Sequence, residues 1–103
     1  MTTTVQSTQN VPKDVLAFCS KSNLAPYLDL ALQLARECFD PVRRLNLEIE
    51  FDPDTDEERV IVEVGIEMPV NEVLERNSEY TSQWVAQAPL EARQKIRLLY
   101  NIL

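Results

Sequence analysis

Histidine is absent from this chain, and glycine occurs only once in its 103 residues. The absence of histidine excludes the commonest general base at neutral pH, every Ser-His-Asp or Cys-His triad and every metal site that uses imidazole. A single glycine, Gly65, cannot build a dinucleotide-binding turn or a phosphate-binding loop, because both need several glycines for close backbone approach. We therefore expect a protein that has no cofactor and is not an enzyme.

Basic residues are scarce: 10 Lys and Arg stand against 17 Asp and Glu, which gives a net charge of -7. This charge opposes adhesion to nucleic-acid phosphates and to anionic membrane surfaces, so we expect neither as a partner. No apolar run approaches the length of about 18 residues that a membrane-spanning helix needs. The first ten residues also lack the basic and apolar regions of a signal peptide, which favours a cytoplasmic location.

Cysteine occurs twice, as Cys19 and Cys38. Both lie among apolar residues, and thiols stay reduced in the cytoplasm. We interpret them as small core side chains rather than as a disulfide or a reactive pair.

The length, together with 45% hydrophobic residues, fits one globular domain. Residues 1–10 (MTTTVQSTQN) are mainly polar and cannot bury enough apolar surface to offset the entropy of ordering them. The sequence therefore predicts a disordered N-terminal tail over residues 1–11 and a single α+β domain over residues 12–103.

The first part of this domain carries two helical patterns. A helix of two or three turns begins near Pro12. The second helix has apolar residues at spacings of three and four and takes Asn23 as its N-cap. It ends at Pro41, because proline cannot donate the next helical hydrogen bond.

Two strands follow, where the apolar period changes from 3.6 to 2. Apolar and polar residues alternate over 45–51, and β-branched residues alternate over 60–67. The stretch DPDTDEE between them favours a turn, so the strands form an antiparallel hairpin. Two strands make only a marginal sheet, so helices must cover its apolar face, and its open edges favour a homodimer with a continuous four-stranded sheet.

Helical spacing returns in the last third of the chain. A third helix runs over 70–88, and Pro89 ends it and begins a fourth. Residues 97–103 fit either this fourth helix or a strand. The predicted order is α-α-β-β-α-α, a two-stranded antiparallel hairpin covered by helices, which dimerisation would extend to a larger sheet.

The acidic stretch between the two strands is the candidate metal site. Asp52, Asp54, Asp56 and Glu63 occupy positions 1, 3, 5 and 12 of a calcium-binding loop. Position 6, however, is Glu57, where the sharp turn needs glycine, and the flanking segments are strands rather than helices. We interpret the stretch as a solvated turn, with weak binding of a divalent metal or a small ligand as the alternative function.

Candidates for partner binding form two groups. The first is the polar face of the hairpin: Glu48, Glu50, Glu63 and Glu67. This row suits recognition of a basic partner better than paired-carboxylate catalysis, which needs a pocket with positioning groups. The second group is Tyr80 and Trp84, which we interpret as core residues at helical spacing; on a partly covered helix they would instead belong to an interface.

Roughly residues 40–103 resemble a group of short bacterial α+β proteins of unknown function, through VNEVLER, EYTSQWVAQAP, RLLYNIL and the preceding LNLEIEFDPDTDEERVIVEVGIEM. The resemblance implies a small bacterial cytoplasmic protein and supplies no catalytic residue. Some proteins of this kind are acidic halves of two-protein modules, such as antitoxins that neutralise a basic toxin, although this chain has no evident DNA-binding element. The leading expectation is a non-enzymatic protein-interaction module whose partner is another protein or a second copy of itself.

Overall fold

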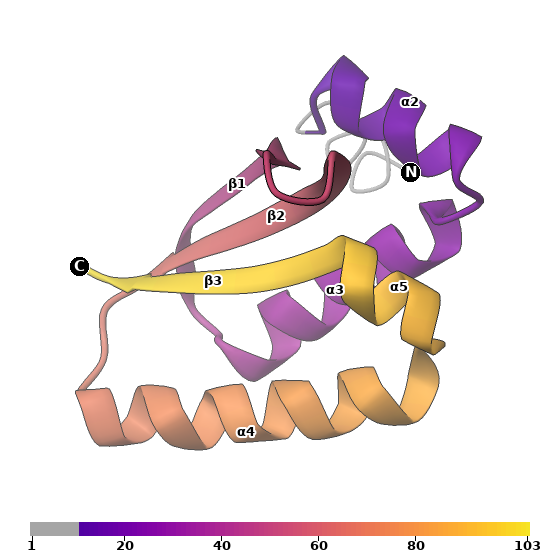
Figure 1. Ribbon diagram of the computed structural model, residues 1–103. Coiled ribbons are helices and arrows are strands. Elements are labelled where there is room, and N and C mark those ends of the chain that lie inside the picture. Colours follow the sequence, from indigo (N-terminus) through magenta and orange to yellow (C-terminus); the bar gives the residue numbers. More distant parts are fainter. Residues whose placement is uncertain (1–10) are drawn as a thin grey trace, which may run out of the picture.

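The computed structural model describes residues 11–103. The elements are α2 (Lys13–Lys21), α3 (Ala25–Cys38), β1 (Val42–Asp52), β2 (Glu57–Ile66), α4 (Val70–Gln87), α5 (Leu90–Lys95) and β3 (Ile96–Ile102) (Figure 1). The α+β class is confirmed. The predicted tail lies outside the described residues except for Val11, which is buried in the core, so the folded part includes one residue more than expected.

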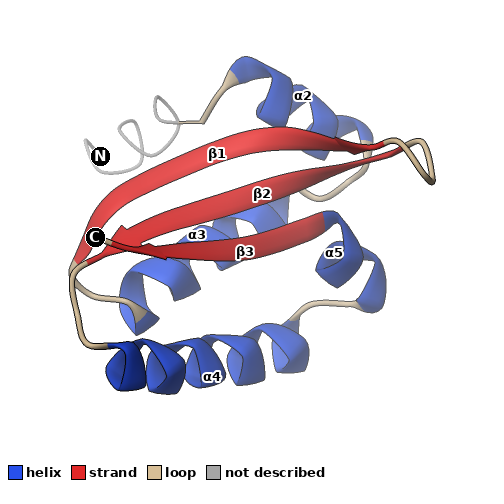
Figure 2. Ribbon diagram, turned by 60° about the vertical axis from the view of Figure 1, so that its left-hand side comes forward, coloured by secondary structure: helices blue, strands red, loops and turns tan. Residues whose placement is uncertain are grey.

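The sheet has three strands in the order β1-β2-β3. β1 and β2 form the predicted antiparallel hairpin, with Leu47 opposite Val62. β3 lies on the other side of β2 and runs parallel to it, with Leu98 opposite Val62, and α4 and α5 make the crossover between the two strands (Figure 2). The prediction of only two strands is therefore wrong, because the free edge of β2 is completed from within the chain.

The segment that fitted both a helix and a strand is β3. Its side chains alternate: Ile96 is buried, Leu98 and Tyr100 are half-buried against the core, and Leu99 between them is exposed. A helix would have brought Leu99 to the same face as Ile96. The strand is favoured because it forms backbone hydrogen bonds with the edge of β2. If this segment were a helix turn, the N–H and C=O groups along that edge would have no strand to pair with.

Asn23 ends α2 and does not cap α3. Its φ of 58° lies in the left-handed region that asparagine tolerates. The N–H of Leu24 donates to the carbonyl of Cys19 at 2.7 Å, and the N–H of Asn23 to that of Ser20 at 3.3 Å, the bond pair that closes a helix C-terminus. The predicted N-cap is therefore wrong, and α3 begins without a side-chain cap, with Pro26 in its first turn.

The core lies on one face of the sheet, where the helices cover it (Figure 2). Its largest fully buried side chains include Val15, Leu24, Phe39, Val60, Val62, Val64, Ile66, Val73 and Ile96. Cys19 and Cys38 are free and buried, which confirms them as core residues. Burial raises the pKa of the Cys19 thiol to about 11, so it stays protonated and unreactive at neutral pH.

Candidate functional site

The acidic turn, residues 52–58, comprises the loop between β1 and β2 with the adjoining strand ends and carries the densest negative charge of the described chain. Asp52, at the end of β1, accepts the N–H of Asp54 at 2.9 Å and the Arg59 guanidinium at 2.7 Å. Arg59 also lies 3.6 Å from the Glu50 carboxylate, so its charge is shared between two acids. The remaining acids of the turn are exposed and form no ion pair within residues 11–103: Asp54, Asp56, Glu57 and Glu58.

We expect Asp52→Asn to melt at a lower temperature than Asp54→Asn at neutral pH. The N–H of Asp54, and then the charge of Arg59, lower the pKa of the Asp52 carboxyl below its ordinary value. A lowered pKa means that the carboxylate stabilises the fold above the unfolded pKa and that this contribution disappears as pH falls through the folded pKa. Both variants remove one negative charge from the same turn, so their melting curves should converge in acid. Equal melting temperatures at neutral pH would contradict the role of Asp52.

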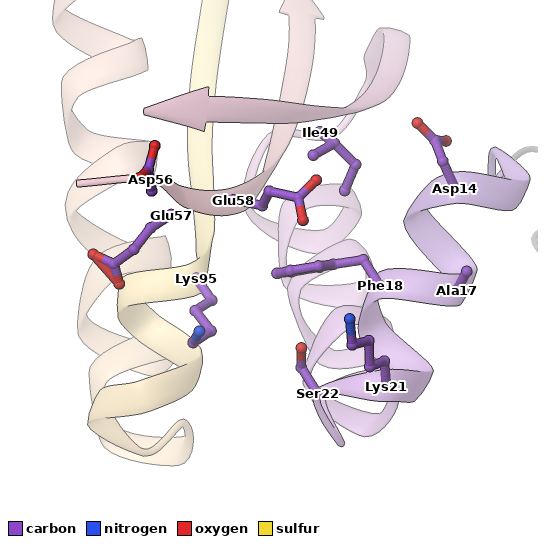
Figure 3. Close-up of a pocket in the computed structure, with 10 residues that line it drawn as sticks. All are labelled: Asp14, Ala17, Phe18, Lys21, Ser22, Ile49, Asp56, Glu57, Glu58 and Lys95. Carbon is purple, nitrogen blue, oxygen red and sulfur yellow. The ribbon is translucent and has the colours of Figure 1, made fainter. Parts of the chain in front are cut away.

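Beside this turn lies an open cleft of about 520 Å³ between α2 and the end of the hairpin (Figure 3). Phe18 extends from α2 into the cleft, and Glu58 reaches toward it from β2. Lys21 and Lys95 line the same hollow from α2 and α5. Asp14, Phe18 and Lys21 share one face of α2 because they are spaced by four and three residues.

Sequence reasoning missed this cleft. It joins Phe18 of α2 to Glu58 at the start of β2, forty positions later in the chain, and nothing in either segment alone shows that they meet. The one available signal was the spacing of Asp14, Phe18 and Lys21, which puts an aromatic side chain between charges on a helix that also has a buried face.

The four residues of the candidate metal site are not brought together. Asp52 lies opposite Glu57, whereas Glu63 lies opposite Asn46, six residues further along β2 from Glu57. Six strand residues span about 20 Å. Within residues 11–103 no group of three or more His, Cys, Asp or Glu side chains is arranged to hold a metal ion.

Most glutamates in the acidic row of the hairpin have a polar partner within the structure. Glu50 lies beside Arg59, and Glu63 accepts a hydrogen bond from the Asn101 side chain of β3. Glu67 follows β2 and pairs with Arg43 at 3.0 Å. Only Glu48 lacks such a contact with another part of residues 11–103. The outer face of the hairpin is therefore mixed in charge, and the unpaired acids are concentrated at its end.

Tyr80 and Trp84, the second pair of partner-binding candidates, lie inside the protein. They are 3% and 6% exposed, and their rings stack with centroids 6.3 Å apart. Phe39 contacts Tyr80 at a centroid distance of 6.2 Å. Neither side chain is available to a partner in this structure, and the core interpretation fits both.

No helix in the described part of the chain is long and apolar enough to cross a membrane. Comparisons of the sequence with protein-family models and with curated proteins find no significant match, and a comparison with solved structures finds none either. The functional proposals below therefore depend on the geometry of this chain.

Proposed function

We propose that the protein is a non-enzymatic interaction module of the cytoplasm that binds a basic segment of a partner protein at the end of its hairpin. The observation that supports this most directly is the group of four exposed acids without an ion pair at the hairpin end, which adjoins an open cleft with an aromatic side chain. Charge of one sign beside a hydrophobic anchor point is the composition of a protein-recognition surface.

Recognition at this site uses two kinds of residue: acids that attract the basic segment, and side chains that contact it directly. Asp54, Asp56 and Glu57 attract a basic segment and speed its association. Glu58 and Phe18 would hold an arginine, because a guanidinium can pair with a carboxylate and stack on an aromatic ring at once. Lys21 lines the α2 side of the cleft, whereas Lys95 lies beside Glu57 and Glu58. Both lysines repel a cation, which directs the basic residues of the segment away from these two positions and toward the exposed acids of the turn.

This proposal agrees with the acidic composition of the chain and extends the analogy with the acidic halves of two-protein modules. An antitoxin-like protein neutralises a basic partner by covering its active surface, and it needs no catalytic residues of its own. The lack of histidine in this chain fits that role.

A tagged protein purified from its own cells tests the proposal by native mass spectrometry. We expect wild type to carry a stoichiometric basic polypeptide. The turn variant Asp54→Asn/Asp56→Asn/Glu57→Gln/Glu58→Gln should bind it at least about tenfold more weakly and with less dependence on salt. The matched control Asp29→Asn/Glu37→Gln/Glu75→Gln/Glu91→Gln removes four exposed acids elsewhere and should keep the complex.

Equal capture by the turn variant and by wild type would overturn the proposal. The alternative, weak binding of a divalent metal or a small ligand, has its own readout in a thermal-shift screen, because a ligand that binds the native state raises its melting temperature. A rise with calcium or magnesium alone, in the absence of any polypeptide partner, would favour that alternative.

A further inference from the structure

The free edge of β3 is a second surface, separate from the cleft. Within residues 11–103, β3 pairs only with β2. The N–H of Leu103, which follows β3, donates to the carbonyl of Ile66 at 2.8 Å. Backbone groups alternate in direction along a strand, so those of Leu99 and Asn101 also point to β2. The N–H and C=O groups of Leu98, Tyr100 and Ile102 therefore point outward, without a strand to receive them.

This edge lacks the protection that the opposite edge of the sheet has. β1 contains two arginines and three glutamates or aspartates, and its register shifts between Val42 and Arg44. Charge and register shifts of this kind discourage pairing with another strand. β3 has the sequence IRLLYNI, in which Arg97 is the single charge and neither proline nor glycine occurs. It is the edge that remains competent to accept a strand.

Unpartnered apolar side chains lie beside the same edge, on α4. Arg76 donates to the carbonyl of Cys38 at 3.3 Å, so this side of α4 faces α3. Successive helix residues turn by about 100°, which puts Val70, Leu74 and Val85 on the opposite flank. They are 60%, 55% and 48% exposed. Both ribbon views show α4 beyond β3, on the side away from β1 (Figures 1 and 2). Because the flank is turned away from α3, the helical spacing directs it to the side of α4 where the free edge lies.

We propose that the β3 edge and this flank of α4 together bind an extended segment of another protein, which adds to the sheet as a fourth strand. The outward backbone groups of Leu98, Tyr100 and Ile102 supply its hydrogen bonds. Every second side chain of the added strand is apolar and covers Val70 and Leu74.

The other side chains of the added strand point to the outer face of the sheet. Arg97 lies on that face, where it lines a hollow with Glu57 and Glu58 but forms no ion pair within residues 11–103. An acidic residue in the added strand, opposite Arg97, would be its partner. The occupant is thus a strand of alternating apolar residues with a carboxylate on its polar side, which differs from the basic segment expected at the cleft.

A second copy of this chain fits the edge less well. Antiparallel pairing of two β3 strands about a two-fold axis puts the helices of both copies on the same face of the joined sheet. Since α4 extends beyond β3, each copy's α4 would occupy the space beneath the other copy's β3 (Figure 2). A single strand meets no such obstacle. The structure therefore favours a strand from a partner over the homodimer that open edges suggested from the sequence.

The experiment is an NMR titration of the ¹⁵N-labelled full chain with a short capped peptide in which valine alternates with threonine and one central threonine is replaced by glutamate. At millimolar peptide we expect the amides of Leu98, Tyr100 and Ile102 to shift and to become protected from hydrogen exchange. Those of Leu99 and Asn101, already directed to β2, should gain little protection.

Variants separate this site from the cleft. Leu74→Glu and Ile102→Pro should each weaken peptide binding at least about tenfold, the first by charging the flank and the second by removing an outward N–H. Leu16→Glu, which charges an exposed leucine of α2, is the matched control and should bind as wild type does. The double variant Asp54→Asn/Asp56→Asn, which keeps Glu57 and Glu58 beside Arg97, should also bind the peptide normally, so the two proposals fail independently.

Three results would overturn the proposal. One is the absence of shifts at millimolar peptide, and another is a response confined to the cleft around Phe18. The third is a change at Leu98, Tyr100 and Ile102 with protein concentration alone, which sedimentation would identify as self-association through this edge.

Discussion

Replacing Trp84 with alanine should lower the free energy of unfolding by about 3–5 kcal/mol, the usual cost of truncating a buried tryptophan. The side chain is only 6% exposed and stacks on Tyr80, which in turn contacts Phe39, so the cavity would open in the middle of the helix layer. Urea unfolding followed by far-ultraviolet circular dichroism measures the loss. Fluorescence is unsuitable because Trp84 is the only tryptophan of the chain.

The neighbouring residue provides the control for this variant. Val85 is 48% exposed, and Val85→Ala should change stability by no more than about 0.5 kcal/mol. A Trp84→Ala protein that unfolds at the same urea concentration as wild type but loses its partner would mean that the ring belongs to an interface after all.

The next largest effect concerns β3. Ile96→Ala should cost about 2–5 kcal/mol, because the side chain is 2% exposed at the point where α5 becomes β3. Leu99→Ala should cost no more than about 0.5 kcal/mol, since Leu99 points to the outer face and is 51% exposed. Thermal and urea unfolding of both variants give the comparison.

The pair of variants distinguishes the strand from the helix that the sequence also allowed. On a helix, Ile96 and Leu99 would share a buried face and both substitutions would be costly. Equal losses of stability at the two positions would therefore contradict the pairing of β3 with β2.

Elements with local causes were predicted from the sequence. The apolar spacing of α3 and the alternation of β1 and β2 depend on neighbours within a few residues, and all three elements exist as expected, although β1 and β2 each begin three residues earlier. The third strand depends on a distant part of the chain. Residues 97–103 fit both a helix and a strand, and only pairing with the free edge of β2 decides for the strand. Asn23 was assigned to the wrong helix for a similar reason: capping α3 and closing α2 need the same residue type, and the backbone angle alone distinguishes them.

The candidate site was predicted in composition but not in arrangement. The acidic turn is where the sequence put it, yet the pairing of Glu50 and Asp52 with Arg59 depends on the hairpin register. The same register places Glu63 far from Asp52. The cleft depends on the packing of α2 against the hairpin end, and no local pattern encodes that contact.

The parallel position of β3 sets an order of assembly during folding. The hairpin partners Leu47 and Val62 are 15 positions apart in the sequence, whereas Val62 and Leu98 are 36 positions apart, with α4 and α5 between them. Contacts of long sequence separation form late because closing the larger loop costs more entropy. Until then β2 presents an open edge that is apolar on its core face and also carries Ile61 on the other. The interval before β3 docks is therefore the stage of folding at which this chain is most exposed to aggregation.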